Sequence, residues 1–295
     1  MDAVLTKICR IALLAGLSLA LASGAHAANY VRAGNVSVSW KLDEILGASP
    51  KDARLTNLMF RFNVGKETLH HRGTYFAQQF HFDNSGSSGT TGYLGLQPQS
   101  SEGGKAYLRA VFSTFISGAK TNDDHCYAGA DGGDGASCGV EFPAIYGRTY
   151  GIRVFKTGNH TWSGEVQDMV TNESIHIGSW TLPDTTGDLR PSGEGFAEYY
   201  AFYMAGYPQF VVPTCVQLAK IDVVYGPVTT DDFGGGIGSV YDAREYGSEE
   251  CRGKDSGFFS QSKKVSVIIP VGRTLSANSE LVQRGFVTDS HMVPY

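Results

Sequence analysis

The chain has 295 residues, with 24 lysines and arginines against 29 aspartates and glutamates, so its formal net charge is −5 at pH 7. This balance, with no basic cluster, argues against nucleic acid or an anionic membrane surface as a partner. Glycine is abundant at 37 residues while proline, at 10, is not, and the glycines separate apolar segments, which is typical of many turns rather than of disorder.

The N-terminus has the pattern of a secretory signal peptide. Lys7 and Arg10 precede the twelve-residue apolar run "IALLAGLSLALA", which is shorter than the ~20 residues of a membrane-spanning helix. The small residues Ala25 and Ala27 predict cleavage after Ala27. We therefore expect a signal peptide at residues 1–27 and a mature protein that is secreted or periplasmic, with no membrane insertion after cleavage.

Short apolar segments, rich in aromatic and β-branched residues, follow at roughly hairpin intervals. They lie at residues 36–40, 57–64, 74–82, 93–98, 106–115, 138–144, 149–157, 161–170, 174–183, 196–204, 219–228 and 264–272. Helical periodicity occurs only at 42–48 and 277–285, where each candidate helix has at most two turns. The pattern predicts an all-β protein, an antiparallel β-sandwich of jelly-roll or lectin-like type.

The best break in this pattern is the stretch "TTDDFGGGIGS" at residues 229–239, and the chain after it is more polar. We therefore predict a β-sandwich domain at residues 28–228 and a C-terminal extension at 229–295. A disulfide is expected to anchor the extension.

Four cysteines remain after the predicted cleavage. An even number in an exported chain favours disulfides, and four cysteines allow three pairings. Proximity in the sequence favours Cys126 with Cys138 and Cys215 with Cys251. A zinc site is not expected, because the chain has no CxxC pair and no histidine at zinc-finger spacing.

The stretch "CYAGADGGDGASC" between Cys126 and Cys138 is rich in glycine and carries Asp131 and Asp134. It lacks the spacing of a helix-flanked calcium loop, although a looser site of oxygen ligands using Asp131 or Asp134 stays open. No GKS or GKT sequence marks a phosphate-binding loop. We expect a loop tied by a disulfide and no cofactor, with calcium as the alternative.

Candidate catalytic groups are carboxylates, because no GxSxG sequence marks a serine nucleophile. Glycoside hydrolysis needs two carboxylates on either side of the bond that is cleaved. Glu141, Glu165 and Asp168 are the candidates for such a pair, and Glu194 and Glu198 also lie on or beside predicted strands. Acidic residues are common on any surface, so a purely structural role is the alternative for each.

Aromatic residues gather in the second half of the predicted sandwich, where Trp162, Trp180, Tyr199 and Tyr200 are candidate ligand-binding residues. Sugars stack on exposed aromatic faces. Core packing is the alternative, and for Trp162 two valines on the same predicted strand face favour it.

Three functions follow from these patterns. The first is a secreted, lectin-like β-sandwich that binds an extracellular glycan without catalysis. The second is a carbohydrate-active hydrolase or lyase that uses a carboxylate pair. The third is a structural or host-interaction protein of the cell exterior.

Six stretches stand in an order that is similar to a known pattern: "YLGLQ" (93–97), "FSTF" (112–115), "ADGGDGASC" (130–138), "IYGRTYGIRV" (145–154), "WSGEVQDMVTNESIHIGSW" (162–180) and "AEYY" (197–200). Over about residues 74–200 the chain resembles an uncharacterised family of secreted and envelope proteins, domain of unknown function 3472. Asp131 and Asp134 lie near the expected glutamate, and Tyr146 replaces a tryptophan. The resemblance implies a β-sandwich and carries no established activity or catalytic residues.

Overall fold

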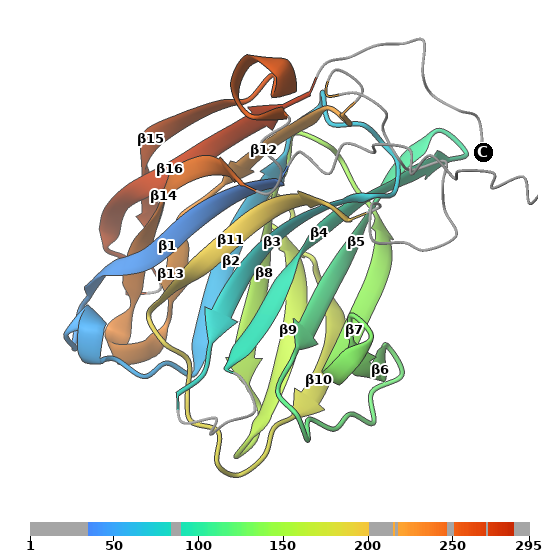
Figure 1. The fold of residues 1–295 in the computed structure, drawn as a ribbon. Helices are drawn as coiled ribbons and strands as arrows, with labels where there is room; N and C mark the ends of the chain where they lie inside the picture. The colour runs from blue at the N-terminus through green and yellow to red at the C-terminus, as the bar shows by residue number, and fades with distance from the viewer. Residues whose placement is uncertain are drawn as a thin grey trace, which may run out of the picture.

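The computed structural model describes residues 35–83, 90–200, 215, 218–246, 251–269 and 271–285. The predicted signal peptide lies outside the described residues. The described chain is almost entirely antiparallel β-structure, which confirms the predicted fold class of an all-β sandwich (Figure 1). Short 3-10 turns occur at Pro50–Asp52, Asp232–Gly234 and Gly253–Ser256. No helix among the described residues is long and apolar enough to cross a membrane.

The strands occur at nearly all the predicted positions. They are β1 (Asn35–Ile45), β2 (Asn57–Val64), β3 (Thr74–His81), β4 (Thr91–Glu102), β5 (Lys105–Thr114), β6 (Cys126–Ala130), β7 (Gly133–Pro143), β8 (Thr149–Lys156), β9 (Thr161–Asp168), β10 (Ser174–Thr181), β11 (Ser192–Tyr199), β12 (Ile221–Tyr225), β13 (Val228–Thr230), β14 (Gly236–Tyr246), β15 (Phe259–Ile268) and β16 (Thr274–Arg284). Of these, β6, β14 and β16 were not predicted as strands, and of β13 only Val228 lay in a predicted segment.

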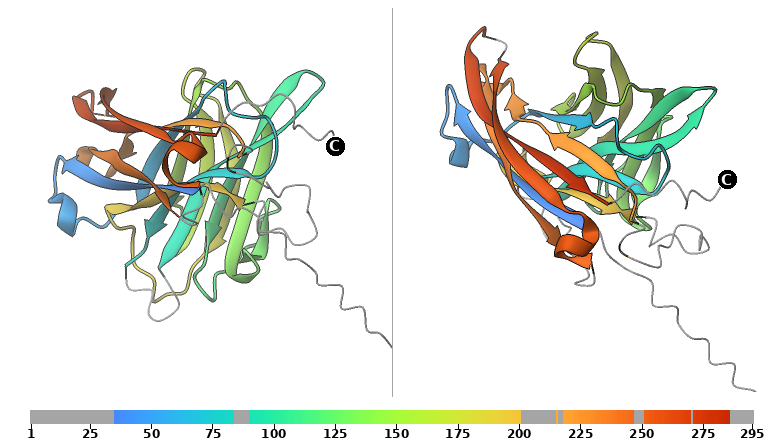
Figure 2. Two further views of the ribbon diagram at one scale, coloured as in Figure 1. Left: turned by 45° about the horizontal axis from the view of Figure 1, so that its top comes forward. Right: turned by 90° about the horizontal axis from the view of Figure 1, so that it is seen from above.

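These strands form one continuous sheet that folds into two facing layers. One layer has the order β10-β9-β8-β2 and the other has the order β11-β3-β4-β5-β7-β6, with β13, β14 and β1 joining them. β12 pairs with β2 and β16, and β15 pairs with β16. Figure 2 shows that the red and orange C-terminal strands lie beside the blue N-terminal strand.

An aromatic core fills the space between the layers, because alternate residues of each strand point inward. Trp40 meets Phe60 edge-to-face, with ring centroids 5.0 Å apart. Phe112 stacks on Trp180 at 4.5 Å, which connects β5 in one layer to β10 in the other. These rings are almost fully buried, so their apolar surface is removed from water, which stabilises the fold.

Both short helices predicted from the sequence are wrong. Residues 42–45 continue β1 as far as Ile45, and residues 277–284 belong to β16, which pairs with β15 on one side and β12 on the other. Such short segments have little helical stability of their own, so strand pairing overrides their periodicity.

The predicted boundary at 228/229 falls inside β13 and is corrected by the sheet topology. β14 pairs with β1 from Asn35↔Tyr246 to Ile45↔Gly236 and lies between β13 and β1. The described residues after 229 are therefore part of the same sheet rather than an appendage. The predicted disulfide between Cys215 and Cys251 is present.

Candidate functional site

The outer face of the layer β11-β3-β4-β5 carries a hollow that we call the carboxylate groove. Strand alternation sends Phe76 and Phe80 of β3 into the core and Gln79 to this face. The groove has a volume of about 380 Å³. It is lined by Ser37, Gln79, Tyr93, Phe115, Asp131, Glu194, Gly195, Phe196, Glu198 and Tyr246.

Strand β11 supplies two of the carboxylates. Glu194, Phe196 and Glu198 occupy alternate positions and so share the outer face, while Ala197 between them is buried. Glu198 pairs in register with Tyr75 of β3. Glu194 and Glu198 are four residues apart, so about 13 Å of strand separates them, the span of an extended ligand rather than of one small group.

The hairpin of β6 and β7 brings the third carboxylate, Asp131. Ala130 pairs with Gly133, and the two residues between them have positive φ, 49° for Asp131 and 79° for Gly132. An Asp-Gly pair in this conformation is typical of a two-residue type I′ turn. The hydroxyl of Tyr93 donates to the Asp131 carboxylate, lying 3.1 Å from each of its oxygens.

The electrostatics of the groove distinguish Glu198. Partial burial raises the pKa of the Glu198 carboxyl, and the negative charge of Asp131 raises it further. Burial, and then the charge of Asp131, also raises the pKa of Tyr93 far above its ordinary value, so Tyr93 stays a neutral donor. Glu198 thus keeps its proton at a higher pH than an ordinary glutamate, as a general acid requires.

At the other end of the groove, Glu194 is held by a histidine. His81 Nε2 lies 2.9 Å from Glu194 Oε2, and His81 Nδ1 lies 3.1 Å from the hydroxyl of Thr91. This contact fixes Glu194 in place, whereas Glu198 is distinguished by its raised pKa.

Glu141, Glu165 and Asp168, the three candidates for a catalytic carboxylate pair, do not form such a pair in the structure. Glu165 and Asp168 lie on opposite faces of β9. Glu141 lies on β7 and accepts a hydrogen bond from Arg72 Nη2 at 3.2 Å. Arg148 Nη1 donates to Asp168 at 2.9 Å.

Asp168 has a structural role in the turn between β9 and β10. Its Oδ1 accepts the backbone N–H of Val170 at 2.8 Å. Burial alone would raise the pKa of Asp168, but the bonds from Val170 and Arg148 outweigh burial and hold that pKa below its usual value. Asp168 is therefore an ionised turn residue.

Three of the four candidate ligand-binding aromatics lie in the core, which agrees with the alternative favoured for Trp162 and corrects the ligand-binding prediction for Trp180 and Tyr199. Trp162 and Trp180 are each 1% exposed, and Tyr199 is 3% exposed. Trp162 packs edge-to-face against Phe82, at 5.0 Å between ring centroids. Tyr200 is half-buried and belongs to an aromatic cluster with Tyr75, Tyr93, Phe115 and Phe196, the last three of which line the groove. Trp162 and Trp180 are register partners in the antiparallel pair of β9 and β10.

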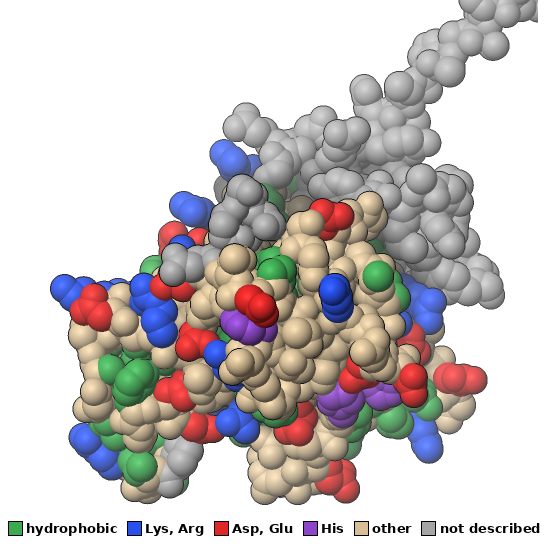
Figure 3. Space-filling model, turned by 90° about the horizontal axis from the view of Figure 1, so that it is seen from below, with side chains coloured by type: hydrophobic (Ala, Val, Ile, Leu, Met, Phe, Trp, Pro, Cys, Tyr) green, Lys and Arg blue, Asp and Glu red, His purple; other side chains and the backbone are tan. Residues whose placement is uncertain are grey.

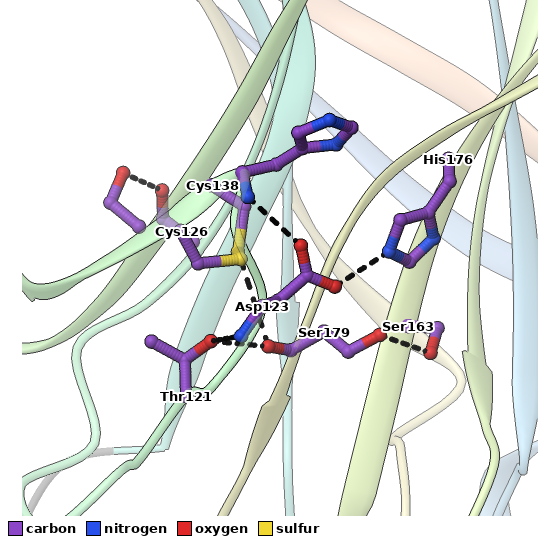
Figure 4. The surroundings of a disulfide bond; sticks show 10 residues. Thr121, Asp123, Cys126, Cys138, Ser163, His176 and Ser179 are labelled. Atoms are coloured by element: carbon purple, nitrogen blue, oxygen red, sulfur yellow. Dashed lines mark hydrogen bonds and ion pairs between the residues drawn. A yellow bond between two sulfur atoms is a disulfide. The ribbon is translucent and has the colours of Figure 1, made fainter.

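The predicted Cys126–Cys138 disulfide is confirmed and joins residues directly opposite each other in β6 and β7. Figure 4 shows its surroundings, in which Asp123 Oδ2 lies 2.7 Å from His176 Nε2. The disulfide lies so close to β10 that a Cβ at Gly178 would be 2.4 Å from Cys126 Sγ. The hairpin is thereby fixed against the opposite layer.

The described residues offer no observation in favour of a metal site or of a nucleic-acid-binding surface. Within the described ranges, no three His, Cys, Asp or Glu side chains converge to hold a metal ion. The calcium alternative at Asp131 and Asp134 stays a prediction, which the effect of a chelator on the melting temperature would test. On the face in Figure 3, basic side chains lie scattered among acidic ones without a continuous basic patch.

No protein family model and no curated protein matches the chain, and the chain is similar only at low identity to the solved structures described next. Among solved structures, Scytalido-glutamic peptidase with a peptide-based transition-state analogue is 11% identical, with a TM-score of 0.43, over 86% of this chain and 98% of that chain. SCP-B, a member of the eqolisin family of peptidases, in complex with the tripeptide Ala-Ile-His, is 12% identical, with a TM-score of 0.41, over the same shares.

The CBM2 module of the evolved Dit of Lactobacillus casei BL23 phage J-1 is 12% identical, with a TM-score of 0.24, over 55% of this chain and 68% of that chain. Identities and TM-scores as low as these carry no conclusion about function. The resemblance to domain of unknown function 3472 likewise stays a prediction.

Sequence reasoning identified Glu198 only as one acidic residue among several, and it interpreted Asp131 as a calcium candidate. The local signals were present: the "ADGG" turn and the alternation of "GEGFAEY". What the sequence lacked was the pairing of β11 with β3, which places Glu198 beside Tyr75, and the folding of the β6–β7 hairpin toward Tyr93.

Proposed function

We propose that this protein is a hydrolase of an extended extracellular polysaccharide, with Glu198 and Asp131 as its acid–base pair. The observation that carries the proposal is the groove itself, which is lined both by a half-buried glutamate of raised pKa, Glu198, and by an aspartate, Asp131, that accepts a hydrogen bond from a neutral tyrosine. Pairs of titratable groups whose environments differ in this way are typical of acid and base assignments.

The roles follow from the protonation states. The carboxylate of Asp131 accepts a proton from a water molecule as the oxygen of that water attacks the scissile carbon. Protonated Glu198 donates its proton to the leaving oxygen as the bond to that oxygen breaks. Tyr93 orients Asp131 through its hydrogen bond, and Phe196 and Tyr246 supply apolar surface along the groove.

The second candidate is glycan binding without catalysis. The observation that favours it is the aromatic share of the lining, since Tyr93, Phe115, Phe196 and Tyr246 border one groove. Aromatic rings with a few polar groups can hold a sugar without any chemistry.

The decisive experiment compares wild type with Glu198→Gln and Asp131→Asn for reducing-sugar release from mixed polysaccharides between pH 3 and pH 8. Each substitution should lower the rate by about 100-fold or more, the usual contribution of a general acid or base. Wild-type activity should fall as pH rises through the raised pKa of Glu198, because the acid then loses its proton.

Matched controls come from the same elements. Asp134→Asn changes a carboxylate of the same hairpin that does not line the groove, and Glu165→Gln changes a carboxylate outside it, so both should retain activity. Glycan binding by wild type and Glu198→Gln alike, with no sugar release from either, would support the second candidate. Release of peptides from denatured protein, with no sugar release, would show that the pair acts on amide bonds.

A further inference from the structure

We infer that the β6–β7 hairpin is the positioning device of the groove: its disulfide and its Asp131–Gly132 turn hold Asp131 against Tyr93 and Glu198. This inference rests on the proposed function. Cys126, Cys138 and Gly132 are positioning residues because none of them lines the groove.

The tip of the hairpin projects beyond the sheet that supports its base. Pairing of β7 with β5 runs from Tyr107↔Pro143 to Thr114↔Ala136 and ends there. Residues 130–135 continue past this point, and β6 pairs with β7 alone at the edge of the sheet. Besides its hydrogen bond from Tyr93 and the packing of Gly135 on Thr114, the position of Asp131 therefore depends on the geometry of the hairpin itself.

Two local devices set that geometry. The register between β6 and β7 shifts between Ala128 and Ala130, where Gly129 has a φ of 92°, so a bulge re-aims the strand just before the turn. The turn itself needs positive φ at Asp131 and Gly132. Glycine adopts this conformation without steric cost, so Gly132 lets the turn form with Asp131 at its first corner.

The disulfide provides the third constraint. It joins opposite residues of the two strands, and Cys138 is fully buried. It also lies against Gly178 of β10, which leaves no room for a side chain at that position. The hairpin is thus tied to itself and seated on the other layer, while its tip extends to Tyr93.

The test follows the titration of Glu198, because that measurement needs no substrate. The full protein is labelled with ¹³C at glutamate carboxyls, and the Glu198 signal is assigned by its loss in Glu198→Gln. Since the negative charge of Asp131 raises the pKa of Glu198, moving Asp131 away lowers it. Asp131→Asn should lower the Glu198 pKa because it removes that charge. Gly132→Ala and the double variant Cys126→Ser/Cys138→Ser should lower the Glu198 pKa as well, because they move Asp131 away.

The chain offers close controls for both changes. Gly104, in the turn between β4 and β5, has a φ of 77° with open space around it, as Gly132 has at 79°. Gly104→Ala and Cys215→Ser/Cys251→Ser should leave the Glu198 titration unchanged. The hydrolytic rate should fall about 100-fold in the hairpin variants, as expected for a displacement of about 1 Å, and stay unchanged in the controls.

Three results would overturn parts of this account separately. If Asp131→Asn lowers the Glu198 pKa but the hairpin variants do not, the positioning role fails and the carboxyl pair stands. If Asp131→Asn leaves that pKa unchanged, the pair does not interact and the proposed function fails with it. If the control variants shift the titration equally, the effect is a general loss of structure, and the specific role of the hairpin is refuted. Should the double cysteine variant not fold, Gly132→Ala decides alone.

Discussion

At the scale of single residues, the clearest departures from ordinary protein chemistry are charged groups held away from water. Glu198 is partly buried beside Asp131, and the guanidinium of Arg284 is 1% exposed. Burying a charge costs free energy unless partners replace the lost water. Glu198 lines the carboxylate groove, where the proposed function explains its burial. Arg284 does not line the groove, so its burial has no such explanation.

Glu198→Gln should stabilise the fold while it removes activity. The folded pKa of Glu198 lies above its unfolded value of about 4.3, so this residue destabilises the fold as pH rises through the window between those two values. Below the window the carboxyl is neutral in both states, and the substitution should change nothing. Above it, we expect a gain of about 0.5–2 kcal/mol, the usual range for a stabilising replacement.

Urea unfolding at pH 3 and pH 7 checks this expectation. Glu194→Gln, on the same strand face but paired with His81, is the matched comparison and should show no such gain. A loss of stability in Glu198→Gln at pH 7 would mean that the ionised carboxylate has a stabilising partner.

Arg284→Met should raise the free energy of unfolding. In the part of the chain that the structure describes, Nε, Nη1 and Nη2 of Arg284 all lack a hydrogen-bond partner. Desolvation lowers its pKa to about 10, although the charge of Glu245 acts in the opposite direction. An apolar side chain of similar length fills the site without that penalty, which gives a gain of about 1–4 kcal/mol.

Thermal unfolding of Arg284→Met beside the exposed variant Arg244→Met measures this gain. Arg244→Met should change the melting temperature little, because exposed ion pairs contribute little. Destabilisation by Arg284→Met would indicate that the guanidinium holds the surrounding strands together.

At the scale of elements, periodicity predicted most strands, and it failed where pairing decides the structure. The segments at 57–64 and 161–170 were found almost to the residue, because inward positions such as Phe60, Phe62 and Trp162 are large and apolar. β14 and β16 were missed, since "GIGSVYDAREY" and "TLSANSELVQR" carry few large apolar residues and are stabilised by the neighbours they pair with. Alternation reveals which strands are buried but not which strands are adjacent.

The β9–β10 hairpin offers a direct test of the burial of its tryptophans. Trp162 should be fully protected from acrylamide quenching in the folded protein, and its fluorescence should not respond to oligosaccharides. Trp162→Ala should lose about 3–5 kcal/mol of stability, as large-to-small core replacements do. Quenching of Trp162 in the native protein, or loss of glycan binding without loss of stability in the variant, would contradict its place in the core.

At the scale of the whole molecule, the layers are joined by strands from both ends of the described chain. β1 lies between β11 and β14, with Val36 opposite Ala197 on one side and Glu245 on the other. The groove depends on the same arrangement, because Ser37 of β1 and Tyr246 of β14 line it together with β11. No local sequence pattern encodes such pairings, so the site could not be assembled from the sequence.

Removal of residues 229–295 should therefore prevent folding rather than detach an appendage. The truncated chain loses β14, β15, β16 and all of β13 except Val228, and one edge of β1 is left without its partner. We expect near-ultraviolet circular dichroism without native signal and rapid proteolysis at all temperatures. A truncated protein that unfolds cooperatively would restore the boundary at 228 as a true domain limit.

The place of β1 also determines when this protein can fold. The partners of β1 in the sheet, β11 and β14, follow it about 160 and 200 residues later in the chain. β1 therefore cannot complete its pairing until the chain has been synthesised as far as Tyr246. Loops of that length close slowly, and contacts so distant in sequence are typical of slow β-proteins. Until the later strands are available, the aromatic strands of the incomplete sheet stay exposed and need protection from aggregation.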